Sequence, residues 1–323
     1  MMPQLPVLGL IATPVVLAAI AIEWWAVRKG RINGRYCARD AATSISMCAG
    51  NIMINSALAF LSLGGLALAA HWRVIDLGVS LTTCVTGYIL HDFLYYWKHR
   101  AGHRMRWFWA EHVTHHSSQH YNLTTALRQP WTGPLTGLLF TGIPMVLLGF
   151  PVVIVLGASS VHLAYQLWIH TEAIGKLPAW VEAIFVTPSH HRVHHATNPE
   201  YLDSNYGGTL IIWDRLFGSF VPEAADEATR YGIVRPLRTH NPLVVAYHGF
   251  GGLFADFWRD GLKPHHWARR AVNPPGWSPD GDHQRSDELK AEWRARMAAG
   301  LAADEDELIQ EDSAPEAMKV AAE

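Results

Sequence analysis

Long apolar segments alternate with polar ones along the first half of the chain, a pattern that predicts membrane-spanning helices. The first apolar segment, residues 5–27, is interrupted only by Glu23. No basic region precedes it and no convincing cleavage site follows, so we expect a retained transmembrane helix rather than a signal peptide. Two further apolar segments cover residues 45–70 and 74–97. Each is long enough to cross a hydrocarbon layer of about 30 Å as a helix.

A fourth apolar segment runs from residue 131 to residue 169 and is long enough for two more spans. Gly149, Phe150 and Pro151 interrupt it, and a proline at such a break favours the end of a helix. The pattern therefore predicts an all-α, multi-pass membrane bundle with four or five spans. The last two spans could instead form a short hairpin that enters the membrane and returns to the same side.

The positive charge of the loops alternates along the chain. Residues 28–40 and residues 98–130 each contain five Lys or Arg, residues 71–73 contain one, and the turn near Pro151 contains none. Because cytoplasmic loops collect Lys and Arg, this alternation predicts that the N-terminus lies outside and that the loop of residues 98–130 lies in the cytoplasm. The membrane would be a bacterial inner membrane or the endoplasmic reticulum.

Composition adds a polar cap to the membrane bundle. Half of the 323 residues are hydrophobic, yet the mean hydropathy is only +0.06 because long polar stretches follow the apolar segments. The net charge of −2 and the absence of a basic run with interleaved aromatic residues argue against a nucleic-acid partner. The three cysteines are scattered, so neither a disulfide framework nor a cysteine metal site is indicated.

Histidine is concentrated in one region of the sequence. Thirteen of the nineteen histidines lie between His91 and His195. Imidazole is the commonest side-chain ligand of transition metals, and so many histidines in one region cannot all be satisfied core residues. The region therefore predicts a metal site. Eight of these residues form three short sets, which are His99 and His103; His112, His115 and His116; and His191, His194 and His195.

The spacing within each set lets the imidazoles converge. Residues four apart lie on one face of a helix, and the second set falls within an arc of about 100° at ~3.6 residues per turn. Pro188 and Pro199 bracket the third set, so we expect a short helical segment there. The loop charge places all three sets on the cytoplasmic side, where they could share one metal centre.

The number and type of ligands point to iron. Eight or nine histidines exceed the three or four that one zinc ion needs, so two ions are the economical interpretation. The chain has no HExxH sequence and no cysteine near the sets, which argues against a zinc protease or a cysteine-ligated deaminase. Nitrogen ligands with open coordination positions suit redox-active iron, and two irons can activate O₂ to attack a C–H bond.

Other aromatic and histidine residues near the sets are weaker candidates. His170 ends an apolar segment and is either a ligand or an interfacial histidine. Trp107 and Trp109 are best interpreted as an anchor at the membrane interface. Ordinary hydrogen-bonding roles are at least as well supported as ligation for His91, His120, His162 and His190.

The segments around the histidines resemble the fatty acid hydroxylase and sterol desaturase superfamily of membrane di-iron oxygenases, and are similar above all to its branch that cleaves alkylglycerol ethers. The resemblance covers about residues 77–248. It rests on residues 92–103, 112–118, 121–129, 165–172, 187–195 and 205–218.

The resemblance implies a helical membrane bundle with a cytosolic di-iron cap. It implies that the eight histidines of the three sets bind two iron ions, with His170 as a ninth ligand in the family's Gln166-x₃-His170 pattern. It also implies O₂ as co-substrate and hydroxylation of a lipid drawn from the bilayer. In the ether branch the carbon beside the ether oxygen is hydroxylated, the product collapses to an aldehyde, and tetrahydrobiopterin supplies the electrons.

One position departs from the pattern of that branch. Its members carry a glutamate directly after the second histidine of the first set, where this chain has Arg104. A reversed charge beside a cationic metal pair changes the local electrostatics. The ether substrate and the pterin therefore stay open, the electron donor is not identified, and Arg104 is a candidate contact for lipid headgroups or for an anionic part of the substrate.

Negative or hydrogen-bonding side chains are needed behind so many neutral imidazoles. Asp92 lies seven residues before His99 on the same helical face and could instead make an ordinary polar contact. The candidates for this supporting role are Asp92, Gln166, Glu172, Asp203 and Asn205.

These observations predict three regions and leave two other functions open. Residues 1–73 would form the N-terminal membrane helices, residues 74–250 the di-iron domain, and residues 251–323 a cytosolic extension with a helix at 286–308 and a disordered acidic end. The alternatives are a desaturase or hydroxylase of a sterol, carotenoid or sphingolipid, and a membrane haem or metal carrier without enzymatic activity.

Overall fold

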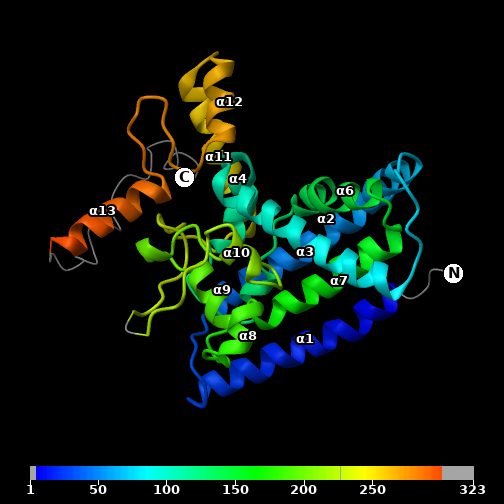
Figure 1. The fold of residues 1–323 in the computed structure, drawn as a ribbon. Helices are drawn as coiled ribbons and strands as arrows, with labels where there is room; N and C mark the ends of the chain where they lie inside the picture. Colours follow the sequence, from blue (N-terminus) through cyan, green and yellow to red (C-terminus); the bar gives the residue numbers. More distant parts are fainter. Residues whose placement is uncertain (1–4, 226, 300–323) are drawn as a thin grey trace.

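A bundle of long helices carries a cap of shorter elements at one end (Figure 1). The computed structural model describes residues 5–225 and 227–299. Within those residues the chain forms helices and turns without a β-strand, and two isolated β-bridges join Phe185 to Leu210 and Ala196 to Tyr231. The predicted all-α class is confirmed.

The bundle is formed by helices that lie lengthwise beside one another (Figure 1). An apolar core around Leu66, Met145 and Ile154, whose side chains are almost fully buried, holds the helices of residues 38–71, 81–104, 143–147 and 152–168 together. This core lies in the half of the bundle away from the histidines. The helices of the bundle are α1 (Leu5–Arg28), α2 (Ala38–His71), α3 (Leu81–Arg104), α6 (Ile143–Leu147) and α7 (Val152–Trp168).

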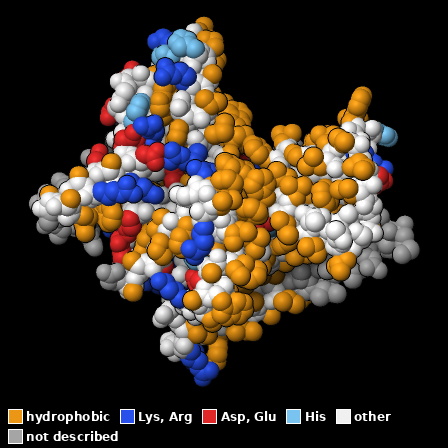
Figure 2. Space-filling view, viewed as in Figure 1, with side chains coloured by type: hydrophobic (Ala, Val, Ile, Leu, Met, Phe, Trp, Pro, Cys, Tyr) orange, Lys and Arg blue, Asp and Glu red, His pale blue; other side chains and the backbone are white. Residues whose placement is uncertain are grey.

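Helix α2 carries the apolar outer surface expected of a membrane span. Its 34 residues extend about 50 Å at a rise of 1.5 Å per residue. Among the residues that the structure describes, it is the one helix both long and apolar enough to cross a membrane. Met53, Phe60 and Leu68 are exposed on it, and hydrophobic side chains cover much of the visible bundle surface (Figure 2). An apolar surface of this extent marks a contact with lipid or protein.

The third apolar segment starts later than the predicted residue 74. Helix α3 begins at Leu81, because Ser80 and Thr83 form a reciprocal capping box. Residues 74–79 instead turn over the end of the bundle. There the backbone N–H of Val74 donates to the carbonyl of Leu147, 2.9 Å away. Helix α3 then continues to Arg104, as the spacing of His99 and His103 predicted.

The fourth apolar segment breaks where the sequence indicated. Its first half is helical in three consecutive short pieces, and Gly149 then adopts a φ of 108° before Pro151 starts α7. Helix α7 has 17 residues, about 25 Å, which is less than the roughly 30 Å of a hydrocarbon layer. The three pieces are α5 (Gly133–Gly137), the π-helical turn η2 (Leu138–Gly142) and α6.

The cap collects the shorter helices at the end of the bundle opposite the turn at Gly149 (Figure 1). Helix α13 begins at Ser286 as predicted, while the remainder of the predicted helix to Leu308 and the predicted disordered end extend beyond the described residues. The cap comprises α4 (Arg106–His116), η1 (Thr125–Leu127), α8 (Ala179–Ile184), α9 (Pro188–His195), η3 (Pro199–Tyr201), α10 (Ile212–Leu216), α11 (Pro242–Asp260), α12 (Pro264–Val272) and α13 (Ser286–Ala298).

Candidate metal centre

Helix ends bring the histidine sets together where the bundle meets the cap. The first set lies in the last turn and a half of α3, the second ends α4, and the third ends α9. The chain turns sharply at Met105, so α4 folds back against α3 and their histidines face each other. His170 follows the end of α7 and points into the same space.

The nine histidines divide into two groups of possible metal ligands. Within each group, one ring nitrogen from every member lies within 4.8 Å of all the others. All nine rings are buried except that of His112, which is half-buried. The group of five contains His99, His103, His112, His116 and His194, and the group of four contains His115, His170, His191 and His195.

Hydrogen bonds behind the rings fix the direction of the free lone pairs. Four Nδ1 atoms face backbone carbonyl oxygens, which can only accept, so these atoms carry the proton and the Nε2 atoms are left as acceptors. The four bonds run from His99 to Tyr206 at 2.8 Å, from His115 to Arg128 at 3.2 Å, from His170 to Gln166 at 2.7 Å, and from His194 to Ser204 at 2.9 Å.

The inward nitrogens are arranged as a cation would require. The Nε2 atoms of His115 and His170 are 3.2 Å apart although both carry lone pairs. The Nε2 atoms of His103, His194 and His195 are buried with no hydrogen-bond partner. Facing acceptors and unpartnered buried nitrogens are costly unless a cation lies between them. The residues therefore fit two transition-metal ions, one in each group.

Burial lowers the pKa of several of these imidazoles and so favours the neutral form that ligates metals. Burial lowers the pKa of His115 to about 4, more than the Arg128 carbonyl raises it. Burial, together with repulsion from neighbouring imidazoles, also lowers the pKa of His194 and His195 well below the ordinary value. At neutral pH the site thus presents lone pairs without first having to lose protons.

Asp203 supplies a carboxylate behind the group of five. Its Oδ1 lies 3.3 Å from Nδ1 of His103, and its Oδ2 lies 3.2 Å from the guanidinium of Arg104. Burial opposes its ionisation, but the hydrogen bond from His103 and the charge of Arg104 hold its pKa below the ordinary value. A carboxylate in this position orients the ring and makes it a stronger ligand.

Arg104 forms ion pairs with two carboxylates of the same chain. Besides Asp203, it contacts both carboxylate oxygens of Asp287 on α13, at 3.0 and 2.6 Å. Two carboxylates thus offset the positive charge that replaces the glutamate of the ether branch. The contact of Arg104 with headgroups or with an anionic part of the substrate stays a prediction.

Among the described residues, Asp92 makes no hydrogen bond to a histidine of the three sets. Its fully buried carboxylate accepts from the backbone N–H groups of Thr209 and Leu210 and from the indole of Trp213, at 2.8 to 3.1 Å. It also lies 3.0 Å from Nε2 of His162. Asp92 therefore fixes the segment after the third set, whose Tyr206 carbonyl orients His99.

The other three predicted supporting residues act in different ways. Gln166 contributes its backbone carbonyl to His170. The amide of Asn205 donates to the carbonyl of His190, 3.1 Å away, and so holds the loop against α9. Glu172 is half-buried beside Tyr231, and burial raises its pKa. None of the hydrogen bonds identified over the described residues joins Glu172 to His170 or to a histidine of the three sets.

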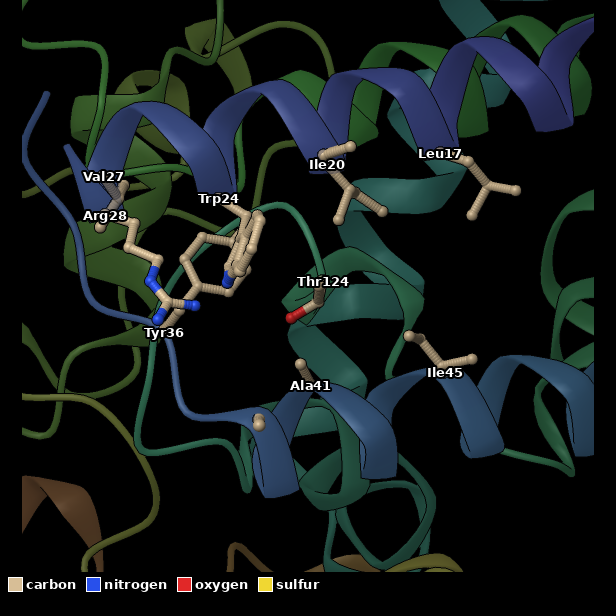
Figure 3. A pocket seen from close by; sticks show the side chains of 11 residues that line it. Leu17, Ile20, Trp24, Val27, Arg28, Tyr36, Ala41, Ile45 and Thr124 are labelled. Carbon is tan, nitrogen blue, oxygen red and sulfur yellow. The ribbon is translucent and has the colours of Figure 1, made fainter. Parts of the chain in front are cut away.

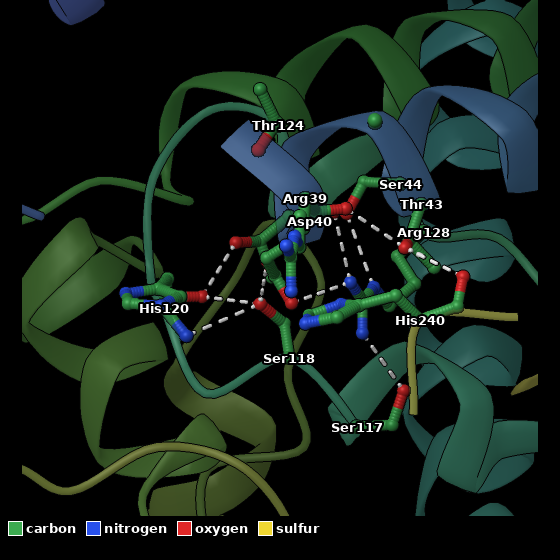
Figure 4. A network of polar contacts seen from close by, with 12 residues as sticks. Arg39, Asp40, Thr43, Ser44, Ser117, Ser118, His120, Thr124, Arg128 and His240 are labelled. Atoms are coloured by element: carbon green, nitrogen blue, oxygen red, sulfur yellow. Dashed lines mark hydrogen bonds and ion pairs between the residues drawn. The ribbon is translucent and has the colours of Figure 1, made fainter. Parts of the chain in front are cut away.

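The sequence did not predict a buried ion pair that lies behind the group of four. Arg128 donates to the carboxylate of Asp40 at 2.7 Å and to the hydroxyls of Ser44 and Ser117, both at 3.1 Å (Figure 4). The carbonyl of the same Arg128 receives the Nδ1–H of His115. The network therefore ties the start of α2 to the second histidine set. A charged pair 88 positions apart leaves no local signal in the sequence.

The two tryptophans predicted to anchor the protein at the membrane interface have different surroundings in the structure. The ring of Trp109 lies 5.1 Å from that of His103 and 5.7 Å from that of His116, so Trp109 covers the group of five. The sequence did not predict this contact, and the assignment of Trp109 to an interface anchor stays a prediction. Trp107, in contrast, is exposed and contacts Phe250 and Phe254.

Glu23 joins the first helix to the group of four. Its buried carboxylate accepts from the hydroxyls of Tyr36 and Thr171 and from the backbone N–H of Leu123. Thr171 directly follows His170, so α1 helps to place this histidine. The interruption of an apolar segment by a carboxylate was visible in the sequence, but its partners were not.

An apolar groove of about 510 Å³ lies between α1 and α2 (Figure 3). Leu17, Ile20 and Ile45 line its apolar part. Arg28, with its guanidinium over the ring of Trp24, lies at its polar end. The groove also reaches Thr124, on the loop that leads to Arg128.

The chain is similar to known lipid-modifying enzymes. Residues 84–219 match the family model described as fatty acid hydroxylase. Human alkylglycerol monooxygenase is 38% identical over 278 residues, which cover 83% of this chain and 59% of the human protein. The alkylglycerol monooxygenase of Xenopus tropicalis is 45% identical over 190 residues, which cover 58% of this chain and 41% of that protein.

A bacterial relative extends the comparison. The ornithine lipid hydroxylase of Rhizobium tropici is 30% identical over 149 residues, which cover 46% of this chain and 45% of that protein. The chain thus spans about half the length of the curated relatives it matches. No solved structure shows a significant match. The resemblance inferred from the histidine sets is confirmed by the family model and by these relatives.

Proposed function

We propose that this chain, whose residues 84–219 match the fatty acid hydroxylase family model, is a membrane-bound di-iron monooxygenase that hydroxylates a lipid. The observation that carries the proposal is the division of nine histidines into two adjoining groups with inward, unpartnered nitrogens. Each group can bind one iron ion, with O₂ as the second substrate. Bound iron would supply the reductive activation of O₂, in which one oxygen atom enters a C–H bond and the other leaves as water.

The protein's own residues hold and shield this chemistry. Carbonyl groups fix the tautomers of His99, His115, His170 and His194, so their Nε2 atoms stay aimed at the metals. The ring of Tyr121 lies 5.2 Å from that of His195 and closes one side of the group of four. Burial of the rings excludes water, which protects an oxidising centre from side reactions.

The proposed substrate is an alkylglycerol ether, because four relatives named alkylglycerol monooxygenase are 34 to 45% identical to this chain over the aligned residues. The groove between α1 and α2 has the apolar lining that the hydrocarbon chain of such a lipid requires. Hydroxylation beside the ether oxygen gives a hemiacetal, which collapses to a fatty aldehyde and glycerol. The reaction consumes two electrons and two protons from a donor. Tetrahydrobiopterin is one candidate for that donor.

The membrane arrangement is part of the proposal. The turn at residues 74–79 hydrogen-bonds to the turn at residues 147–149, so both lie at the bundle end opposite the histidines. The positions of these turns then agree with the alternation of loop charge, which puts the histidines in the cytoplasm. Helices α1, α2 and α3 would cross the bilayer, and α5 to α7 would form a short hairpin within it. Residues 1–73, 74–250 and 251–323 keep the roles inferred for them.

The function can be tested in cells that express the chain and receive an alkylglycerol under ¹⁸O₂. We expect a fatty aldehyde that carries ¹⁸O, trapped at once by reduction to the alcohol. His115→Ala and His194→Ala should abolish this product and lower the iron content of the membrane-bound protein. The exposed His265→Ala on α12 is the matched control and should change neither.

Two other results have defined meanings. Full activity in His115→Ala or in His194→Ala would contradict the metal centre. Hydroxylated ornithine lipid without cleavage of the alkylglycerol would keep the centre and move the substrate to the class of the bacterial relative.

A further inference from the structure

Helix α11 carries a row of exposed apolar side chains that the metal centre does not use. The row has helical spacing and consists of Leu243, Tyr247, Phe254 and Trp258, and Leu262 extends it past the end of the helix. Trp258 is 89% exposed and Leu262 is 93% exposed. Residues four and seven apart lie on one face of a helix, so these side chains form a continuous stripe.

The opposite face of α11 is packed against the cap. Val245, Ala246 and Leu253 are buried. Gly249 lies so close to α4 that an added Cβ would be 2.4 Å from the carbonyl oxygen of Ala110. The exposed stripe therefore cannot turn inward to bury itself. Because α11 is rigidly seated on α4, the direction of the stripe is fixed by the fold.

The stripe faces the side on which the bundle lies. Helices α11 and α12, residues 242–272, form an arm that projects from the cap at a steep angle to the bundle (Figure 1). Figure 2 shows hydrophobic side chains along the side of this arm toward the bundle, and charged and histidine side chains along the other side. If the bundle crosses a bilayer, the apolar side of the arm faces the surface of that same bilayer.

The arm is continuous with the bundle at its base. Val245 and Ala246 form one apolar cluster with Met47 of α2, and the indole of Trp131 donates to the carbonyl of Met47. The ring of Trp131 also contacts that of Tyr247, 5.7 Å away. The stripe thus begins at the level of α2 where the cap meets the bundle, which is the level of lipid headgroups.

The residue types along the arm match an interfacial position. Trp and Tyr favour the headgroup region, because they combine an apolar ring with a polar atom. Lys263 directly follows Leu262 at the outer end of the stripe and suits lipid phosphates, while Arg259 pairs with Asp256 at 2.9 Å. We propose that residues 242–263 lie in the headgroup region of the cytoplasmic leaflet, with the stripe buried in it, as a second membrane contact separate from the spanning helices.

Nitroxide labels on single cysteines, in chains whose Cys37, Cys48 and Cys84 are replaced by serine, test this placement. The full chain is placed in nanodiscs of phosphatidylcholine and phosphatidylglycerol. Labels at residue 60 on α2, residue 258 on α11 and residue 291 on α13 are compared for collision with O₂, which concentrates in lipid, and with a water-soluble nickel chelate. We expect residue 60 to favour O₂ strongly, residue 258 to favour it, and residue 291 to favour nickel.

Each other outcome overturns the placement in a recognisable way. A label at residue 258 that collides with nickel as often as the label at residue 291 would show the arm in water, while residue 60 still reports the state of the bundle. Dipolar broadening between labels at residue 258 would show that a second copy of the chain covers the stripe. If residue 60 also favours nickel, the spanning bundle itself fails, and with it the premise of the arm.

Discussion

The two histidine groups have similar ligands but differ in what supports them. The group of five rests on the carboxylate of Asp203, which Arg104 links to α13 in the cap. The group of four rests on backbone carbonyls and on the buried pair of Arg128 with Asp40 of α2, and Glu23 of α1 places its neighbour Thr171. One group is therefore coupled to the cap, and the other to helices α1 and α2 of the bundle.

This difference has a chemical consequence. A carboxylate behind a ligand adds negative charge, stabilises the higher oxidation state of the metal and strengthens its binding. The group of four has neutral carbonyls behind His115 and His170 and a guanidinium whose charge Asp40 balances. The two metal positions should therefore be unequal in affinity, with the group of five the tighter.

The largest effect should come from breaking the buried pair. Arg128→Met leaves the buried carboxylate of Asp40 without its cationic partner, which typically costs about 3 to 5 kcal/mol. We expect a markedly lower thermal midpoint and loss of iron from the group of four first, measured as one iron per chain rather than two. The exposed Arg39→Met is the control and should keep both. Two irons at an unchanged midpoint would contradict the coupling to α2.

Acid should weaken the iron-free protein. An unfolded histidine takes up a proton near pH 6.5, whereas folded His115 does so only at about 4. Between these values the unfolded state binds more protons, so the free energy of unfolding falls as the pH falls. His115 alone accounts for about 3 kcal/mol at about 1.4 kcal/mol per pH unit.

This pH effect is measured as the free energy of unfolding of chelator-treated protein from pH 7 to pH 4. His115→Gln should show a shallower slope over that window than the unmodified chain. Equal slopes would mean that His115 is not held neutral by burial.

Removing the carboxylate behind His103 should have a moderate effect on metal binding alone. Asp203→Asn keeps the size and a hydrogen-bond acceptor but loses the charge. Iron affinity of the group of five should fall about 10- to 100-fold, measured by competition with a chelator. Asp287→Asn removes the other carboxylate near Arg104 and should change this affinity far less. Equal losses in the two variants would place the effect in Arg104 rather than in Asp203.

The smallest effect should come from the contact between Arg104 and α13. The side chains of Arg104 and Asp287 are 33% and 53% exposed, and exposed ion pairs contribute about 0.2 to 1 kcal/mol. Arg104→Gln combined with Asp287→Asn in a double-mutant cycle should give a coupling energy in this range. Faster hydrogen exchange over residues 286–298 would accompany it. A coupling near zero would show that α13 is held by its other contacts.

The sequence predicted the three histidine sets because the positions within each set follow helical spacing. His112, His115 and His116 converge on any helix, and loop charge indicated that the three sets share one side of the membrane. The break at Gly149 and Pro151 was equally local, since it follows from backbone geometry at these residues.

What escaped prediction depends on pairs that are distant in the chain. Arg128 and Asp40 are 88 positions apart, and Arg104 and Asp287 are 183 apart. Each partner alone resembles an ordinary charged residue. The role of Trp109 was missed for a similar reason, because an aromatic residue near a membrane boundary looks the same whether it faces headgroups or a histidine.

The distant partners of Glu23 also bear on how the chain folds while it is being synthesised. Its partner Leu123 is synthesised 100 residues later and Thr171 148 residues later. At about 5 to 20 residues per second, the second partner follows after roughly 7 to 30 s. If α1 crosses the bilayer as proposed, the carboxylate near its end has water and the hydroxyl of Tyr36 as partners during that interval, which holds this end of the helix near the membrane surface. The first helix is then fixed in place once Thr171, directly after the His170 of the group of four, reaches Glu23.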